Sequence, residues 1–511
     1  MPANILPGAK PLPGSLEIRN IEIWLEQQIW GHRFFSDQTP WFLLLEALGV
    51  IASRAADKNH DRIFPGEPAD GKHEQFSYSM STRPALRILL FKDRHIDEIA
   101  DSQAVSDNSM WSRWFDLVPG GEPQFGYLKD RFTRFSAFRN AVALLRGAEV
   151  ESERKRRPNS RHLAPRGPDM LAADFGETTN GGINKDRRFF ARGGELLYLM
   201  LNRSQHRDKL ENAVRERLLS PGSRWNALAK ILQPEGQQPT AGFEVGYLPL
   251  PKHEVYDTLA QDWLALLSLR GLPEDNLPEP LMRLSGLAVI NYMTLRSAEV
   301  LGVSPTEFPV DMISPDTLAV QRISKDCFRR HRDQSRLAIG KIVEEFAKSP
   351  EYLDAAKQAN PFRAMKELVE KRFNYGLAST PLARVPAELK EQAISNHDQH
   401  LGRVVGFYAE QIGFAVARRG TGRWYAASDG LIEALVLANV KHPMEFETFL
   451  ETLWKRYRIV IGSGVGRQAF QTANYAHLKA NQRLLEDRLR VLGLLKRLSD
   501  DCAFVTNPFV E

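Results

Sequence analysis

The chain has 511 residues, of which 43% are hydrophobic and 26% are charged. This length allows two to four domains with cores of their own, and the composition is that of a globular protein. No run of about 18 uncharged apolar residues occurs, which argues against a membrane-spanning helix. Two cysteines, Cys327 and Cys502, are too few for a disulfide framework or a zinc finger. No secretory signal is recognisable near residue 1, so we expect a cytoplasmic protein.

The net charge is slightly positive. Lys and Arg number 68 against 63 Asp and Glu, which gives +5 with neutral histidines. An excess of this size permits an anionic partner such as nucleic acid but does not require one. The distribution of the charge along the chain is therefore more informative than its total.

Residues 1–150 predict a helical domain with aromatic-rich helices. After a Pro- and Gly-rich start, apolar residues recur at helical spacing in "LEIRNIEIWLEQQIW" (16–30) and "PWFLLLEALGVIASRA" (40–55). Pro40 suits the first turn of the second helix. The segment "YSMSTRPALRILLF" (78–91) fits a short strand or a helix equally well, and both remain open.

Residues 151–188 differ from their surroundings. The segment begins "ESERKRRPNSRHLAPRGPDM" and contains "GETTNGGINKDRR", so it is basic, polar and rich in Gly and Pro. This composition predicts a long surface loop or linker. The basic run is also a possible nucleic-acid contact, although a solvated loop is the simpler interpretation.

Residues 189–420 predict a central helical domain. Asp316 is the expected N-cap of its longest helix. Helix-compatible patterns occupy 194–201, 257–270, 280–301 and 316–348.

The stretch "RRFFARGGELLYLML" (187–201) allows two interpretations. Free backbone N–H groups at the helix start, supported by Arg192, would suit an anion. Alternatively, Gly193 and Gly194 allow another part of the backbone to come close. We favour close packing.

The segment 421–511 has the most specific pattern. Ser428 is the expected N-cap of an amphipathic helix in 428–440, and "KHPMEF" (441–446) suits one brief strand. Further helices are predicted at 446–457 and 474–492, with a flexible loop, "IVIGSGVGRQAFQT", between them. Gly493 suits the left-handed residue that ends a helix. The chain then predicts a hairpin, "LLKRL" and "CAFV" joined by a turn at 499–501.

The order helix, strand, helix, helix and hairpin over 428–509 resembles the winged helix-turn-helix family. In members that bind DNA, the third helix enters the major groove and the wing touches the DNA backbone or minor groove. Winged helices also dock proteins, so both partners remain open. Arg456, Arg458 and Arg467 lie nearby in sequence. The residues that the resemblance implies for DNA binding are Lys479, Asn481, Gln482, Arg483, Arg488, Arg490, Lys496 and Arg497.

Four carboxylates oppose a DNA partner. Glu486 and Asp487 lie on the third helix and would repel phosphates, and Asp500 and Asp501 lie at the expected tip of the wing.

Motifs for catalysis or cofactor binding are not recognisable. "RIVIGSGVGR" (458–467) has Arg467 where a dinucleotide fingerprint needs its third glycine, and "RRGTGRW" (418–424) lacks the Lys-Ser/Thr ending of a phosphate loop. His397 and His400 are spaced for a metal on one helical face, but surface histidines are the simpler interpretation. We therefore expect no enzyme activity, no cofactor and no metal.

A second resemblance is carried by "FFARGGELLYLML" (189–201) together with "FLETLWKRYRIVIG" (449–462) and "LRVLGLLKRLSDDCAFVTNPF" (489–509). The chain resembles helical proteins of bacterial anti-phage defence islands, in particular the methylation-associated defence system, which are typically encoded beside an ATPase. The resemblance implies a non-catalytic component of a defence complex with a separate ATPase as partner. The alternatives are a stand-alone DNA-binding regulator and a nuclease with an unrecognised site.

Overall fold

The fold was analysed on a computed structural model. Helices dominate, as the sequence predicts, and the strands are short. Among the helices in the described parts of the chain, none has both the length and the apolar character needed to cross a membrane. The structure describes all residues except 1–5, 7, 13–20, 33, 35–37, 69–70, 82, 103–105, 148, 152–160, 164–166, 171–175, 178–182, 185–191, 221, 237–239, 379, 471–473, 500–501 and 511.

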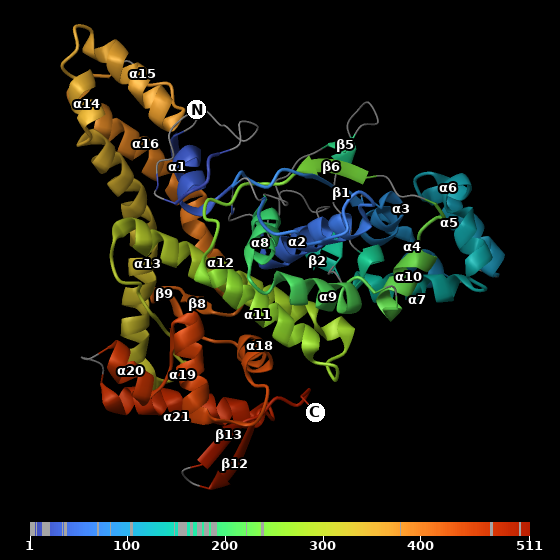
Figure 1. Cartoon of the computed structure of the whole chain (residues 1–511). Helices are drawn as coiled ribbons and strands as arrows, with labels where there is room; N and C mark the ends of the chain where they lie inside the picture. The colour runs from blue at the N-terminus through green and yellow to red at the C-terminus, as the bar shows by residue number, and fades with distance from the viewer. Residues whose placement is uncertain are drawn as a thin grey trace.

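Helix α12 (Pro278–Leu301) lies at the centre of the largest hydrophobic core (Figure 1). It is buried along most of its length, which requires apolar residues on all its faces. Pro278 opens the helix, and Gly302, with a φ of 68°, closes it. The helices packed on α12 are α1 (Ile21–Trp30), α2 (Pro40–Ala56), α11 (Glu254–Ser268), α13 (Leu318–Ala347), α17 (Val404–Gln411) and α18 (Asp429–Asn439).

Helices α2 and α8 (Gly193–Arg203) pack very closely, because α8 begins with two glycines. A Cβ added at Gly194 would lie 2.5 Å from Glu46 Cβ and 2.6 Å from the Ala47 nitrogen. The Gly194 N–H donates to Glu46 Oε2 at 2.7 Å, so the protein's own carboxylate occupies the position that an external anion would take. The prediction of close packing is confirmed.

A two-stranded antiparallel sheet covers one side of α2. Strand β1 (Ser77–Ser81) pairs with β6 (Thr240–Glu244). The segment 78–91 therefore contains both structures that its sequence allowed, because α3 (Pro84–Arg87) follows the strand and continues as a π-helical turn over Ile88–Lys92.

A second, separate core lies to one side of the first (right in Figure 1). Its centre is aromatic: Trp114 packs with Trp111 and Phe138, and the Trp114 Nε1–H donates to Asp93 at 2.9 Å. We call this the aromatic subdomain. Its helices are α3, α4 (His95–Ala100), α5 (Asp107–Leu117), α6 (Gly121–Arg131), α7 (Phe135–Arg146) and α10 (Arg224–Ile231).

The cores group the chain differently from the expected division at residues 150, 188 and 420. Residues 21–80 share their core with 196–214 and 243–505, whereas 85–145 form the aromatic subdomain with α10. Within 151–188 the structure describes a turn at Pro168–Met170 and parts of two strand pairs. The basic run at 154–157 lies outside the described residues. The pairs are β2 (Glu149–Glu151) with β3 (Arg161–Leu163), and β4 (Gly176–Glu177) with β5 (Ile183–Asn184).

Among the described helices, α13 is the longest. It connects the C-terminal part to an arm formed by α14 (Pro350–Ala355) and α15 (Pro361–Phe373) at the upper left of Figure 1. The prediction of Asp316 as its N-cap is wrong. Ser314 caps a short 3-10 turn ahead of α13, and its hydroxyl accepts from the Asp316 N–H at 3.2 Å. The remaining helices around α13 and α11 are α9 (Arg207–Arg217) and α16 (Val385–Gln399).

His397, on α16, is buried rather than on the surface. Its ring bonds Glu26 Oε1 at 2.9 Å and Ser335 Oγ at 3.0 Å, and it stacks on Trp30. The interpretation of two surface histidines is therefore wrong for His397, although His400 is exposed. In the described residues, no three His, Cys, Asp or Glu side chains are placed to hold a metal ion.

The predicted helices, brief strand and hairpin of the C-terminal segment are present, and we call residues 428–509 the C-terminal unit. Its strands form an antiparallel sheet in the order β10-β13-β12. Gly493 has the expected left-handed backbone, with a φ of 73°. The elements after α18 are β10 (Met444–Glu445), α19 (Phe446–Tyr457), β11 (Ile459–Val460), α20 (Ser463–Ala469), α21 (Tyr475–Val491), β12 (Leu495–Ser499) and β13 (Cys502–Val505).

The flexible loop predicted at 459–472 is wrong. Its first residues form β11, which pairs in parallel with β7 (Phe308–Pro309), and α20 follows. The pairing explains the apolar start of this segment, because Ile459 and Val460 are both buried. The C-terminal unit is thus tied to the rest of the chain by backbone hydrogen bonds.

Candidate functional site

The C-terminal unit contains all eight residues that the winged-helix resemblance implies for DNA binding. Helix α21 lies along the bottom of the molecule in Figure 1, with the β12–β13 hairpin projecting beneath it. One face of the helix packs on the body through Leu478, Leu485 and Leu489, which are buried. The eight residues divide between this inner side and the exposed surface.

Asn481 belongs to the inner side and cannot reach a base. Its side chain is fully buried. The amide Nδ2 donates to Val310 O at 2.7 Å, and Oδ1 accepts from the Met312 N–H at 2.8 Å. Asn481 therefore anchors α21 to the strand region before α13, and its assignment to DNA is corrected.

Gln482 and Arg488 are also committed to internal partners. Gln482 Oε1 accepts from the Ser463 N–H at 2.9 Å, and its amide donates to Glu447. Arg488 donates to Ala427 O at 2.7 Å and pairs with Asp429. These contacts hold α21 against α20, α19 and the start of α18.

The other five predicted residues are exposed. Two of them have a carboxylate partner within the unit: Arg490 pairs with Asp487 at 3.0 Å, and Arg497 pairs with Glu486. Lys479, Arg483 and Lys496 have no carboxylate partner among the described residues.

A groove of about 660 Å³ runs between α19, α21 and the hairpin. Its charges are balanced, since four cations and four carboxylates line it. Phosphates entering this groove would meet the carboxylates at close range, which disfavours a nucleic-acid strand there. The charged lining residues are Lys479, Arg483, Arg490, Arg497, Glu445, Glu447, Glu486 and Asp487.

Arginines before α20 serve the interior rather than a ligand. Arg456 donates to Asp262 Oδ1 at 2.6 Å, and the Tyr457 hydroxyl donates to the same oxygen at 2.6 Å. Burial raises the pKa of the Asp262 carboxyl to about 6, and the neighbouring charge of Arg456 limits the rise. Arg458 donates to Thr306 O at 2.9 Å, and burial lowers its pKa to about 10. These residues join the C-terminal unit to α11 and to the loop before β7.

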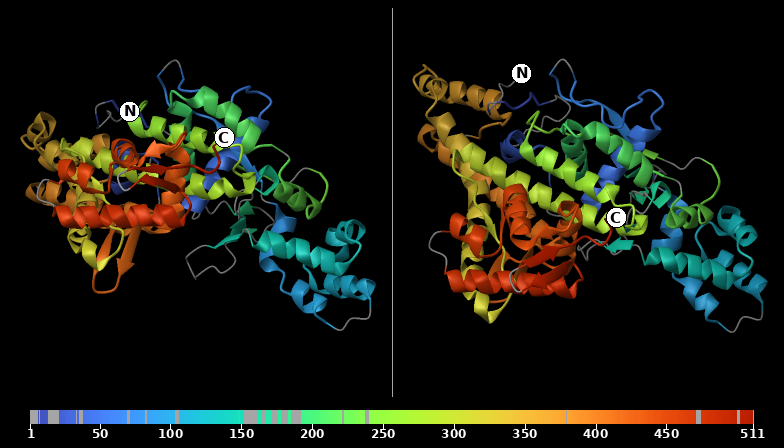
Figure 2. Two further views of the ribbon diagram at one scale, coloured as in Figure 1. Left: turned by 90° about the horizontal axis from the view of Figure 1, so that it is seen from below. Right: turned by 60° about the horizontal axis from the view of Figure 1, so that its bottom comes forward.

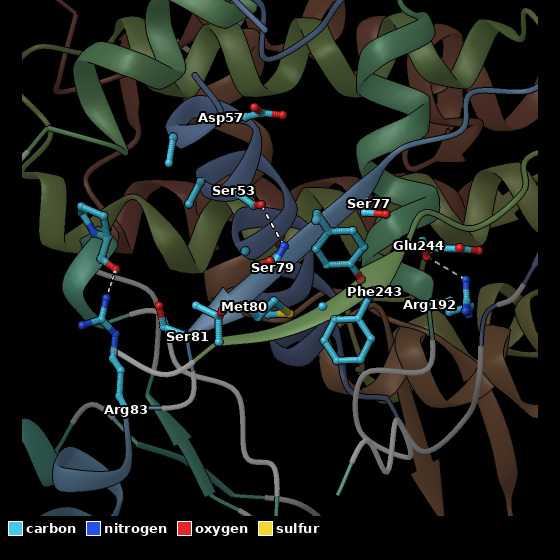
Figure 3. Close-up of a pocket in the computed structure, with 17 residues that line it drawn as sticks. Ser53, Asp57, Ser77, Ser79, Met80, Ser81, Arg83, Arg192, Phe243 and Glu244 are labelled. Atoms are coloured by element: carbon cyan, nitrogen blue, oxygen red, sulfur yellow. Dashed lines mark hydrogen bonds between the residues drawn. The ribbon is translucent and has the colours of Figure 1, made fainter. Parts of the chain in front are cut away.

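A larger cavity, of about 920 Å³, lies against the β1–β6 sheet and the end of α2 (Figure 3). Arg83 and Arg192 lie at its opposite sides, and both have left-handed backbones, with φ of 42° and 74°. Arg83 donates to Pro168 O at 3.0 Å, and Arg192 donates to Glu244 O at 3.0 Å. Both guanidinium groups are thus held by the protein itself.

The cavity has a polar lining. Ser53, Ser77, Ser79 and Ser81 contribute hydroxyl groups, and its described lining includes no histidine or cysteine. Asp57 is engaged elsewhere: the Asn59 N–H donates to it at 2.9 Å, which lowers the pKa of the carboxyl. Ser77 and Glu244 are direct neighbours across the β1–β6 pair, and no hydrogen bond joins their side chains, so we assign no reaction to this lining.

Sequence reasoning missed a basic surface outside the C-terminal unit. The basic segment 418–424 lies in the turn and adjoining strands of a hairpin of β8 (Ala415–Arg418) and β9 (Gly422–Tyr425), and β9 lies against α13. The signal was present on α13, where basic residues recur every three or four positions between 322 and 336.

No protein-family model matches the chain, and no curated protein matches it in sequence at a significant level.

Proposed function

We propose that the chain is a non-catalytic component of a bacterial anti-phage defence system, and that its C-terminal unit is a winged helix that binds a partner protein. The observation that carries the choice of partner is the charge balance of the groove between α19, α21 and the hairpin. A lining with equal numbers of positive and negative groups suits a protein surface with complementary charges, whereas a DNA backbone is uniformly negative.

Two further observations support protein docking. Three of the eight residues expected to contact DNA are held by internal hydrogen bonds, so the inner side of α21 is not available to bases. The unit is also fixed to the main core through β7–β11 and Asp262, which gives the groove a firm support for a second protein. A separately encoded ATPase is the partner that the defence-island resemblance implies.

The proposal is tested with the products of the genes beside that of this chain, each co-purified with the full-length protein. The groove variant is Lys479→Glu with Arg483→Glu, two exposed cations without a carboxylate partner among the described residues. Lys357→Glu with Lys366→Glu is a matched control, because both lysines are exposed and lie on the distant arm. We expect one product to bind the wild type and the control but to bind the groove variant at least tenfold more weakly. Equal binding to all three proteins would contradict groove docking.

A stand-alone DNA-binding regulator is the second candidate, since Lys479, Arg483 and Lys496 remain exposed. That function predicts tight binding to one duplex sequence, with loss of binding when these three residues are changed to Gln. Binding that is insensitive to the three changes would exclude α21 and the wing as the DNA-reading surface.

A further inference from the structure

Within the part of the chain that the structure describes, positive charge is concentrated on α13 and on the segment that contains the β8–β9 hairpin. Residues 318–340 and 401–427 together hold ten Lys and Arg against three Asp and Glu, an excess of seven, whereas the excess for the whole chain is five. The rest of the molecule is therefore close to neutral or slightly acidic, and the positive field is local.

Five of these cations form a stripe along α13. At about 100° per residue, their spacing places them on one face, opposite the buried residues Ser324, Cys327 and His331. With a rise of about 1.5 Å per residue the stripe is about 21 Å long. Its members are Arg322, Lys325, Arg329, Arg332 and Arg336.

The β8–β9 hairpin lies beside this stripe. The Ser324 hydroxyl on α13 donates to Tyr425 O at 3.1 Å and accepts from the Tyr425 N–H at 2.8 Å, which fixes the hairpin to the helix. The β8–β9 hairpin projects from the body of the molecule (lower left in the left panel of Figure 2). A Cβ at Gly420, in its tip, would meet no atom within 4 Å, so the tip is open.

The Trp424 ring makes cation–π contacts with one cation of α13 and one cation of the β8–β9 hairpin. The Lys325 Nζ lies 5.3 Å from the centre of its ring, and the Arg418 Cζ lies 5.8 Å from it. The indole itself is fixed, because its Nε1–H donates to Asp311 Oδ2 at 3.0 Å. The helix stripe and the hairpin thus form one surface rather than two.

Some cations of α13 and the β8–β9 hairpin have no ion-pair partner among the described residues. Arg329 and Arg332 pair with carboxylates of α13, Arg336 pairs with Asp398, and Arg423 pairs with Glu410. Among the described residues, no carboxylate pairs with the remaining cations of the stripe and the hairpin, which are Arg322, Lys325, Arg418 and Arg419.

We propose that α13 and the β8–β9 hairpin form a binding surface for the phosphodiester backbone of a double-stranded nucleic acid. Arginine predominates, and its planar guanidinium suits phosphate oxygens. A duplex carries one phosphate charge per about 1.7 Å of its axis, so a stripe of about 21 Å faces several phosphates. A projecting two-stranded hairpin has the dimensions that the major groove of B-DNA admits, which favours DNA of the two duplexes. This surface is separate from the groove of the C-terminal unit and goes beyond the function proposed for it.

The test measures binding of the full-length protein to a labelled 24-base-pair duplex between about 50 and 300 mM salt, with DNA and RNA duplexes as parallel arms. The surface variant is Arg322→Gln, Arg418→Gln and Arg419→Gln. The matched control removes the same charge from the C-terminal unit, as Lys479→Gln, Arg483→Gln and Lys496→Gln. Thermal unfolding of each protein checks that the fold is intact.

We expect wild-type binding to weaken as salt rises. In the surface variant, affinity at 100 mM salt should fall at least tenfold, and the slope of log K against log salt should become shallower by up to about 2.7. The control should stay within twofold of the wild type. The two duplex arms identify DNA or RNA as the ligand, and binding of either supports the proposal.

Three outcomes would overturn the proposal: no duplex binding by the wild type at 50 mM salt, an equal loss in the control variant, or binding to vesicles with 30% phosphatidylserine in place of duplex. None of these outcomes changes the result expected when the protein is co-purified with a partner. Failure of duplex binding at α13 and failure of protein docking in the groove can therefore be distinguished.

Discussion

His331 is a buried neutral histidine at the junction of α13 and β9. Its Nε2–H donates to Thr306 O at 3.0 Å, Nδ1 accepts from the Tyr425 hydroxyl at 2.8 Å, and the ring stacks on Phe308. Burial, together with the nearby charge of Arg458, lowers the pKa of His331 from 6.5 to about 3. The site therefore favours the neutral ring.

This lowered pKa predicts a loss of stability in mild acid. The unfolded chain binds a proton at His331 below about pH 6.5, whereas the folded chain does not until about pH 3. The contribution of His331 is thus complete above pH 6.5 and is lost as pH falls toward 3. Between pH 7 and pH 5 it should lower the free energy of unfolding by about 2 kcal/mol. The free energy of unfolding can be measured with urea at pH 7 and at pH 5. Its fall between these two pH values should be about 2 kcal/mol smaller in His331→Gln than in the wild type. An equal fall in both proteins would contradict the assignment.

Gly194 shows how one residue sets the distance between two helices. In Gly194→Ala the added Cβ would meet backbone atoms of α2, which cannot rotate away. We expect a loss of about 1–3 kcal/mol in the free energy of unfolding. Gly376→Ala is the control, because a Cβ there meets nothing within 4 Å, and its stability should not fall. Equal stability of the two variants would show that α2 and α8 separate easily.

At the scale of elements, α21 depends on Asn481 for its position. Asn481→Ala would leave the Met312 N–H and the Val310 carbonyl without their buried partner. We expect a loss of about 1–3 kcal/mol and faster hydrogen exchange at Met312. Lys479→Ala, on the exposed side of the same helix, should change stability by less than about 0.5 kcal/mol. If exchange at Met312 is the same in both variants, the anchoring role is wrong.

The helices of the C-terminal unit were predictable because their signals are local. Ser428 caps α18, apolar spacing marks α19, and Gly493 ends α21, and each of these works through neighbours within a few residues. Strand β11 was missed because its partner is β7, about 150 residues earlier in the chain. A two-residue strand in a parallel pair has no local pattern that distinguishes it from a loop.

The candidate site was only partly predictable for a related reason. Helical spacing shows which residues share a face of α21, but not which face packs on the body. Asn481 has the polarity of a DNA-reading residue, and only the buried backbone groups at 310–312 explain its role. The stripe on α13 is visible in the sequence, whereas its union with the β8–β9 hairpin requires the tertiary structure.

At the scale of the whole molecule, two hydrophobic cores predict two cooperative units. The aromatic subdomain shares no buried core residue with the main core, whereas the C-terminal unit belongs to the main core. Native-state hydrogen exchange should therefore give one opening free energy for α5 and α7 and a different one for α12 and α19 together. A common value for all four helices would show that the cores unfold as one.

The central proposal is that the chain binds two partners on separate surfaces, a protein at the groove of the C-terminal unit and a duplex at α13 and the β8–β9 hairpin. The most direct test is hydrogen exchange of the full-length protein with and without saturating duplex at low salt. The account predicts protection at 415–425 and along 318–336, with 475–499 unchanged. Protection centred on 475–499, or no protection in either region, would contradict it.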